Sequence, residues 1–278
     1  MFKKIISPLI AAVILAAAVT VPVFADEEEN AKLLPILMYH QINPSSKYWG
    51  DYTVSPATFE GDLKYLNLHG YTSVTLRQLV AYAHGEGTLP EKPVLITFDD
   101  GQESFAAYGL PLLEKYQMHA VMAIIGRCAD IFTKTEDHNL IYSYLSWPQV
   151  AQLVKSPFVE LAVHTYDMHT LGARRGCIRK KCESLENYNR SFNADLEKVE
   201  NSFQQYTGTK PFAFAYPYGF YSKEAKDVLY QRGYTVLLGC KECVNRLTGT
   251  PEELLDLGRF NRPNGADRQR YFKKMGIV

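Results

Sequence analysis

The 278-residue chain lacks an excess of charge of either sign, since 30 lysines and arginines stand against 30 aspartates and glutamates. It has no long basic block of the kind that contacts nucleic-acid phosphates. Histidine is scarce, with seven in all and none after His169, so two histidines close together are informative. The balanced charge and the lack of a basic block exclude nucleic acid as a partner. What remains is a chain that is 46% hydrophobic, which is ample for the core of one large α/β domain.

Long apolar runs are missing outside the amino terminus, where Ile5–Thr20 follows two lysines and precedes the acidic run Asp26–Glu29. That order is typical of a secretory signal peptide. An uncleaved membrane anchor is the alternative, because Ile5–Ala25 is about long enough to span a bilayer. We therefore expect a protein that is secreted or associated with the cell envelope. The expected divisions are a signal peptide at 1–25, an acidic segment at 26–34 and one domain at 35–278.

The five cysteines are interpreted in the light of that export, which would take them to an oxidising compartment. Cys177 and Cys182 form one local pair, Cys240 and Cys243 a second, and Cys128 stands alone. We expect local disulfides rather than a zinc site of four cysteines, because the pairs are irregularly separated and no histidine accompanies them. Cys128 is expected to be a small buried residue.

Short apolar runs alternate with helical patterns along the rest of the chain. About eight such runs and about six helices predict parallel strands joined by crossover helices. At this length the sequence favours a single (β/α) barrel, distorted or incomplete, with seven to eight strands; a doubly wound open sheet is the alternative. The runs that matter most are Pro35–Tyr39, Val94–Phe98, Val159–Val163 and Phe212–Tyr216. A helix is also expected over Glu103–Gln117 and the last strand over Leu255–Phe260.

Polar residues follow each of those four runs. Active sites of barrels and open α/β sheets are built where the carboxyl ends of strands meet. Two imidazoles and a carboxylate suit a divalent metal with open positions, and adjacent carboxylates ionise together only beside a cation. An Asp-Asp-Gly sequence is also an ordinary solvated turn, so the convergence counts for more than any one motif. In chain order the residues are His40, Asp99, Asp100, His164, His169 and Tyr218.

At these residues the sequence resembles the polysaccharide deacetylase family, carbohydrate esterase family 4, over about Pro35–Arg262. The first motif of the family matches at 97–101, which implies that Asp99 is the general base and Asp100 a metal ligand. The second matches at His164 and His169, which are five residues apart instead of the usual four, as in the branch of biofilm poly-N-acetylglucosamine deacetylases. The resemblance thus implies a divalent ion on Asp100 and the two histidines. Zinc is favoured, with cobalt, nickel or iron as alternatives.

The third motif matches only in part. Pro217 and Tyr218 are present, and a backbone N–H near Tyr218 is expected to help hold the oxyanion. The family usually has an arginine two residues before the proline, where it orients the base, but Ala215 stands there in this chain. Arg259 and Arg262 are therefore the candidates to supply that charge from the last strand.

The source of the catalytic acid is a second departure from the usual pattern of the family. The family usually takes it from a late histidine, and none occurs here. In the biofilm branch an amino-terminal Tyr-His takes that place, which makes His40 the candidate acid, because amide cleavage needs a proton donor. The alternative is that His40 is a structural histidine satisfied by backbone groups.

The resemblance implies a hydrolase that removes N-acetyl groups from an N-acetylglucosamine-containing extracellular or cell-wall polysaccharide, and we expect it to be a monomer. One alternative is an O-acetyl esterase acting on xylan, because the same groups hydrolyse esters. Another is a carbohydrate-binding relative with weak turnover, suggested by the missing arginine and late histidine.

Other surface features allow two interpretations. The basic segment 173–190 is interpreted as a solvated loop or as a rim that grips an anionic glycan. Tyr48 and Trp49 are candidates for stacking on sugars, whereas Trp147 is expected to pack at a helix start.

Overall fold

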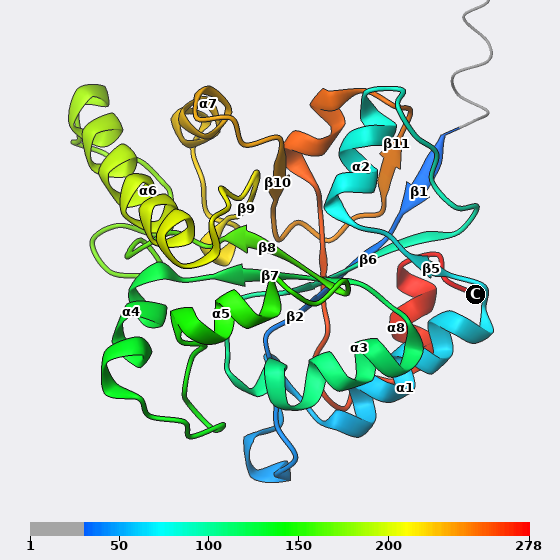
Figure 1. Cartoon of the computed structure of the whole chain (residues 1–278). Helices are drawn as coiled ribbons and strands as arrows, with labels where there is room; N and C mark the ends of the chain where they lie inside the picture. The colour runs from blue at the N-terminus through cyan, green and yellow to red at the C-terminus, as the bar shows by residue number, and fades with distance from the viewer. Residues whose placement is uncertain (1–30) are drawn as a thin grey trace, which may run out of the picture.

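A parallel sheet forms the centre of the molecule (Figure 1). In the computed structural model, which describes residues 31–278, the strand order is β10-β9-β8-β7-β6-β2-β12, and β5 pairs with β6 beside that path. A bridge between Leu238 and Leu257 links the segment before β12 to β10, so the open sheet curls into a distorted (β/α) barrel. The predicted fold class is confirmed. The strands are β2 (Ile36–Tyr39), β5 (Thr72–Ser73), β6 (Pro93–Phe98), β7 (Ala120–Ile124), β8 (Val159–Val163), β9 (Ala213–Ala215), β10 (Val236–Leu238) and β12 (Phe260–Asn261).

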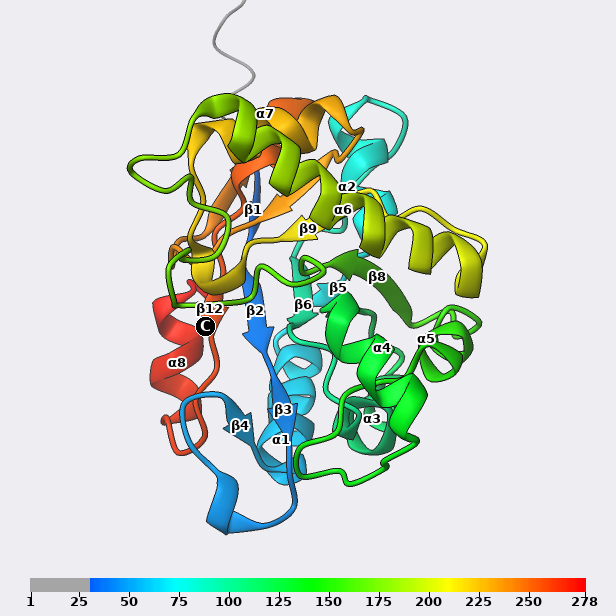
Figure 2. The ribbon, with the colours of Figure 1, turned by 90° about the vertical axis from the view of Figure 1, so that its left-hand side faces the viewer.

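Most of the helices pack against the outer face of the sheet, whereas α2 buries Leu76, Leu79 and Ala83 in the layer inside the barrel. In Figure 1, α1, α3 and α5 lie below the strands and α2, α6 and α7 above them, and Figure 2 shows α6 running across the face turned to the viewer. Helix α1 begins as expected, because the Ser55 side chain accepts a hydrogen bond from the Thr58 N–H and proline occupies the first turn. Trp147 is buried at the start of α5, as predicted. The helices are α1 (Pro56–Leu68), α2 (Leu76–Ala83), α3 (Leu110–Tyr116), α4 (Gly126–Thr135), α5 (Trp147–Leu153), α6 (Leu185–Thr207), α7 (Lys223–Gln231) and α8 (Arg268–Lys274).

The side chains of each strand alternate between two apolar layers, one beneath the helices and one inside the barrel. On β6, Phe98 faces the helices while Leu95 faces the interior. On β8, Ala162 faces the interior. Continuing the same alternation by one step past each strand brings Asp99 and His164 to the interior face at the carboxyl end of the barrel. The period of the strands therefore aims these polar side chains at one place.

Three segments differ from the sequence prediction. A π-helical turn at Phe105–Gly109 precedes α3 in the helix expected at 103–117. Helix α4 was not expected. The predicted strand at 255–260 begins inside a 3-10 helix, Pro251–Asp256, and apart from the single bridge of Leu257 to Leu238 its pairing begins only at β12. The cause is local, because Thr250 and Glu253 form a capping box around a proline in the first turn.

Two short strand pairs lie outside the main sheet. Strand β1 (Lys32–Leu34) is antiparallel to β11 (Asn245–Leu247), and β3 (Gln41–Ile42) is parallel to β4 (Thr53–Val54). The pairing of β1 means that the folded domain begins before residue 35. The predicted signal peptide at 1–25 lies outside the described residues. Across residues 31–278, no helix combines the length and apolar character that a membrane span requires.

The cysteines do not form the expected disulfides. All five are free in the described part of the chain. Cys177 is buried, with its carbonyl accepting a hydrogen bond from the Tyr188 hydroxyl at 2.8 Å, whereas Cys182 is exposed. The first pair is thus divided between the core and the surface, so the prediction of a bridge between them is wrong.

Candidate metal centre and active site

Asp100, His164 and His169 converge at the carboxyl end of the barrel. One potential ligand atom from each lies within 4.8 Å of the other two. Asp100 Oδ1 is 3.5 Å from His164 Nε2 and 3.2 Å from His169 Nε2. Asp100 follows β6 and both histidines follow β8, and only β7 lies between these two strands in the sheet. This is the one set of three or more such groups found among residues 31–278.

Hydrogen bonds orient both imidazoles toward the carboxylate. His164 Nδ1 lies 2.8 Å from the carbonyl oxygen of Ala215, which can only accept, so that nitrogen carries the proton. In a neutral ring Nε2 then presents its lone pair to the site. His169 Nδ1 lies 3.1 Å from the Tyr218 hydroxyl, which leaves its Nε2 facing Asp100 as well. Ala215, where the family usually has arginine, thus contributes through its backbone.

The donor set fits a divalent cation. Asp100 Oδ1 is buried and accepts no well-aligned hydrogen bond, although two ring nitrogens face it. Lone pairs from a carboxylate and two imidazoles that meet in a buried place repel one another unless a positive charge lies between them. The negative charge also acts on the rings, because burial would lower the pKa of His164 but Asp100 and Asp99 raise it. Asp100 itself has φ +73°, a strained backbone conformation for a residue with a side chain.

Asp99 lies beside this set and is held by a buried arginine. Arg259 Nη1 and Nη2 donate to the two oxygens of Asp99 at 2.7 and 2.8 Å, and Arg259 Nε donates to the Gly239 carbonyl at 2.8 Å. Burial would raise the pKa of Asp99, but the Arg259 guanidinium outweighs it and lowers that pKa. The carboxylate is therefore ionised and able to accept a proton. The other candidate, Arg262, binds Asp62 instead.

His40 is half-buried next to the same groups. The charges of Asp99 and Asp100 act on its pKa, which burial nevertheless lowers from the usual value. Its Nδ1 atom is buried without a hydrogen-bond partner among the described residues. The ring packs edge-on against Tyr52, with centroids 4.9 Å apart. The backbone groups that a purely structural histidine would use therefore do not engage Nδ1.

Tyr218 packs beside His169, with the two ring centroids 4.4 Å apart. Its φ of +58° places the residue in the left-handed region, as does the φ of +68° at Thr165 between the two histidines. Together with Asp100, three strained residues that are not glycine thus surround one site. Such strain persists only where the surrounding structure imposes it, and it concentrates at functional sites.

Two further residues near the site were not predicted. Burial, the Cys128 thiol and the Asp100 carboxylate raise the pKa of Tyr144 to about 12. Burial and Asp100 likewise raise the pKa of Cys128 to about 11. The charge of Asp100 therefore acts on both residues, and Tyr144 pairs with Gln102, two positions after Asp100. Neither stands in a motif, and only the packing of α4 and the loop before α5 brings them there.

The basic segment after the histidines is largely engaged within the protein. Arg174 pairs with Glu183, Arg179 with Glu224 and Arg190 with Glu186. Arg175 stacks on the ring of Phe220, 4.3 Å from its centroid. These partners favour the interpretation as a structural loop over that of a glycan-gripping rim.

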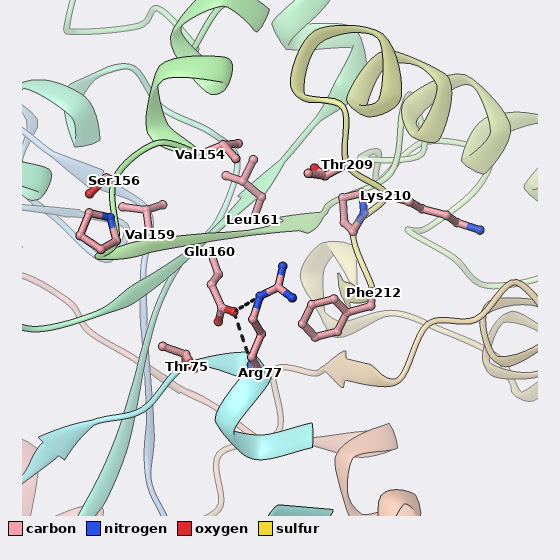
Figure 3. A pocket seen from close by; sticks show the side chains of 12 residues that line it. Thr75, Arg77, Val154, Ser156, Val159, Glu160, Leu161, Thr209, Lys210 and Phe212 are labelled. Atoms are coloured by element: carbon pink, nitrogen blue, oxygen red, sulfur yellow. Dashed lines mark hydrogen bonds and ion pairs between the residues drawn. The ribbon is translucent and has the colours of Figure 1, made fainter. Parts of the chain in front are cut away.

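A pocket of about 290 Å³ lies at the other end of the barrel, at the amino ends of β8 and β9 (Figure 3). Glu160 points into it and accepts hydrogen bonds from the N–H groups of Leu76 and Arg77, so it caps the start of α2. Arg77 also lies 3.5 Å from this carboxylate and over the ring of Phe212. The polar groups of this pocket are thus used within the fold, whereas the candidate metal centre lies at the carboxyl end.

Comparison with known proteins agrees with this geometry. The polysaccharide deacetylase family model matches residues 86–237. The chain is 26% identical over 218 residues to a poly-β-1,6-N-acetyl-D-glucosamine N-deacetylase of Escherichia coli (strain K12), covering 71% of this chain and 32% of that protein. It is 28% identical over 190 residues to the protein of the same name from Staphylococcus aureus (strain MRSA252), covering 68% and 61%. The chain therefore spans less than two thirds of the length of these relatives.

Solved structures are similar over most of both chains. IcaB from Ammonifex degensii is 26% identical with a TM-score of 0.69, covering 88% of this chain and 97% of that one. A de-N-acetylase from Aggregatibacter actinomycetemcomitans is 23% identical with a TM-score of 0.74, covering 88% and 100%. At that identity the second likeness supports the fold alone.

Proposed function

The chain belongs to the polysaccharide deacetylase family, and on that premise we propose that it is a metal-dependent hydrolase that removes N-acetyl groups from a polysaccharide containing N-acetylglucosamine. We further propose that it acts as a monomer outside the cytoplasmic membrane, either secreted or at the cell envelope. The sequence at 1–25 supports the location. The names of the Escherichia coli and Staphylococcus aureus relatives support the substrate class.

One observation carries the proposal: a carboxylate and two imidazoles, Asp100, His164 and His169, bring potential ligand atoms to one point beside an ionised Asp99. A binding protein has no use for a proton acceptor next to a metal set. A hydrolase needs both, one to generate a nucleophile and one to receive its proton. Zinc is the ion that this mixture of nitrogen and oxygen ligands favours, with cobalt, nickel or iron as alternatives.

The metal, when bound, would supply a more acidic water and an electrophile for the acetyl carbonyl. Asp99 then takes the proton of the attacking water as general base. Arg259 keeps Asp99 ionised and fixes its orientation through two parallel hydrogen bonds. Each Asp99 oxygen accepts one of these bonds, so lone pairs remain for the water.

The leaving nitrogen must be protonated for the amide bond to break. We assign this step to His40, whose ring lies near both carboxylates and has a free Nδ1. The backbone N–H near Tyr218 is assigned to the oxyanion that forms at the acetyl carbon, because a donor already placed there costs no reorganisation during the reaction. The Tyr218 hydroxyl keeps His169 in the orientation that the metal needs.

The O-acetyl esterase is the second candidate, because the same base and metal would hydrolyse an ester. The position of His40 favours the amide, since an alkoxide leaves with less need of a proton than an amine does. A weak carbohydrate-binding relative is the third candidate. It is disfavoured by Arg259, which replaces the charge that is missing at Ala215.

The decisive experiment compares acetate release from β-1,6-linked N-acetylglucosamine oligomers and from acetylated xylan. We expect release from the first, loss of activity on chelation, and recovery with zinc or cobalt. His164→Ala should abolish both metal binding and turnover, whereas His119→Ala, which changes a histidine outside the site, should affect neither. Faster release from xylan would favour the esterase, and no release from either polymer would contradict the proposal.

A further inference from the structure

The five-residue spacing of His164 and His169 leaves a loop of four residues between the two ligands, and this loop must keep both rings aimed at one point. Thr165 bends it with φ +68°. One side of the loop is held by backbone hydrogen bonds to the segment after β7. Gly126 N–H donates to the Thr165 carbonyl at 3.0 Å and Arg127 N–H to the Tyr166 carbonyl at 2.9 Å. These bonds engage two of the loop carbonyls but none of the loop N–H groups.

A single side chain from α6 accepts the two N–H groups in the middle of the loop. Asp195 Oδ2 accepts from the Tyr166 N–H at 2.7 Å, and Asp195 Oδ1 accepts from the Asp167 N–H at 2.8 Å. Asp195 is only 7% exposed and forms no ion pair within residues 31–278. A carboxylate that binds two successive backbone N–H groups holds that stretch of chain in one conformation.

The packing of α6 does not require this carboxylate. The helix buries a full apolar face, which is enough to dock it on the barrel. Gly126 also brings the loop close to α6, since a Cβ there would stand 2.8 Å from the Tyr166 ring and 2.9 Å from Val199. A buried carboxylate without a cation costs free energy, so its retention calls for a reason beyond docking. The apolar residues of that face are Tyr188, Phe192, Leu196, Val199 and Phe203.

We propose that Asp195 is a positioning residue of the metal centre: by holding the N–H groups of Tyr166 and Asp167 it fixes the loop so that His164 and His169 face one point before any ion binds. The proposal rests on the proposed metal-dependent function. It assigns the role to a residue more than 25 positions further along the chain, on α6 and outside every motif.

Asp195→Asn is the sharpest variant, because the shape is kept while one oxygen becomes an NH₂ group that faces a backbone N–H. We expect zinc affinity to fall by about 10- to 100-fold, the range seen when partners of metal ligands are removed. The electronic spectrum of the cobalt-loaded protein should change, since the ring orientation changes. Asp195→Glu, which keeps the charge, should recover part of the affinity.

Glu200→Gln is the matched control on the same helix. Glu200 is a partly buried carboxylate that binds Arg232 and the Tyr234 hydroxyl and forms no hydrogen bond with the loop within residues 31–278. It should change stability without changing zinc affinity or the cobalt spectrum. If Asp195→Asn lowers the melting temperature but binds zinc as tightly as the parent, the carboxylate serves folding alone and the proposal is wrong.

Amide hydrogen exchange in the unaltered protein gives a test that needs no variant. With the metal removed, the amides of Tyr166 and Asp167 should exchange slowly, because Asp195 already holds them. Fast exchange that slows only when zinc is added would overturn the proposal, even if Asp195→Asn fails to fold. A failure of the proposed function looks different, since His164→Ala would then leave metal binding and acetate release unchanged.

Discussion

Two buried aspartates bind arginines from the same short stretch of chain, yet only one of them is left able to do chemistry. Asp62 accepts hydrogen bonds from Arg262, from Arg268 and from the Tyr39 hydroxyl. Asp99 accepts only those of Arg259 among the described residues. Each oxygen of Asp62 therefore has two donors, whereas each oxygen of Asp99 has one. Saturation with donors makes Asp62 a structural link, whereas Asp99 keeps lone pairs for the base role that we propose.

Residues that are neighbours in the sequence also divide between the Asp62 cluster and the Asp99 cluster. Tyr39 and His40 are adjacent, but the first points to Asp62 and the second lies near Asp99 and Asp100. Arg259 and Arg262 are three positions apart, an odd offset that puts them on opposite faces of an extended strand. The same strands thus build a structural cluster outside the barrel and a reactive cluster at its mouth. The two clusters are separate because successive side chains of a strand point to opposite faces of the sheet.

The largest expected effect is on turnover in Asp99→Asn. Replacing the base should lower acetate release by roughly 10²–10⁴-fold while zinc stays bound, because Asp100 and the histidines are unchanged. Metal content and acetate release, measured on the same sample, check this. Asp62→Asn is the control, and its turnover per folded molecule should stay within about threefold. A fully active Asp99→Asn would refute the base assignment.

His40→Ala sharpens the comparison between adjacent residues. We expect amide hydrolysis to fall by roughly 10²–10⁴-fold, because the leaving nitrogen loses its proton donor. Activated aryl acetates, whose leaving group needs no proton, should be affected far less. Tyr39→Phe, one residue earlier, should show no such difference between substrates. Equal losses on both substrates in His40→Ala would mean that the acid lies elsewhere.

Asp62→Ala tests the structural cluster. It leaves the buried guanidinium of Arg262 without its counter-charge, so the free energy of unfolding should fall by about 3–5 kcal/mol. Urea unfolding followed by tryptophan fluorescence measures this. Zinc affinity should be unchanged in the folded fraction. A loss of less than about 1 kcal/mol would show that water or another group replaces the carboxylate.

The smallest effect, on the pH dependence of stability, concerns a third carboxylate, Glu160. It is only partly buried, and its neighbour Arg77 is mostly exposed. Burial raises the pKa of Glu160 despite the two N–H donors of α2. An acid whose folded-state pKa is raised stabilises the fold at low pH, and the contribution is lost as the pH rises through that pKa. Relative to Glu160→Gln, the wild-type protein should therefore lose stability from acid to neutral pH, by about 1.4 kcal/mol per unit of pKa difference. If the melting temperatures of the two proteins change with pH by the same amount, the prediction is wrong.

Much of the candidate site was predictable because its residues follow short buried strands. Asp99, Asp100 and His164 come directly after runs that are apolar enough to be recognised locally, and parallel strands bring their carboxyl ends together. Arg259 could not be separated from Arg262, because the last strand was expected at 255–260, whereas β12 begins at Phe260. With the strand in its true place, their odd offset assigns each arginine to its own face.

Other features had no local signal. Asp195 stands in an ordinary helical pattern, and its partners are backbone N–H groups, which every residue has. The cysteines were paired by proximity in the sequence, but the fold buries Cys177 and exposes Cys182. Helix α4 was missed, although it brings Cys128 near Asp100.

The amino-acid sequence by itself determined the α/β class, the strands that end in polar residues, and the kinds of group available for chemistry. These follow from periodicity and composition, which act over a few residues. Only the tertiary structure decided that Arg259 rather than Arg262 neutralises Asp99, that the Ala215 carbonyl sets the tautomer of His164, and that Asp195 holds the loop. The Arg259–Asp99 contact joins residues 160 positions apart. Such contacts depend on how the sheet curls and which helix crosses it, and no local pattern encodes that.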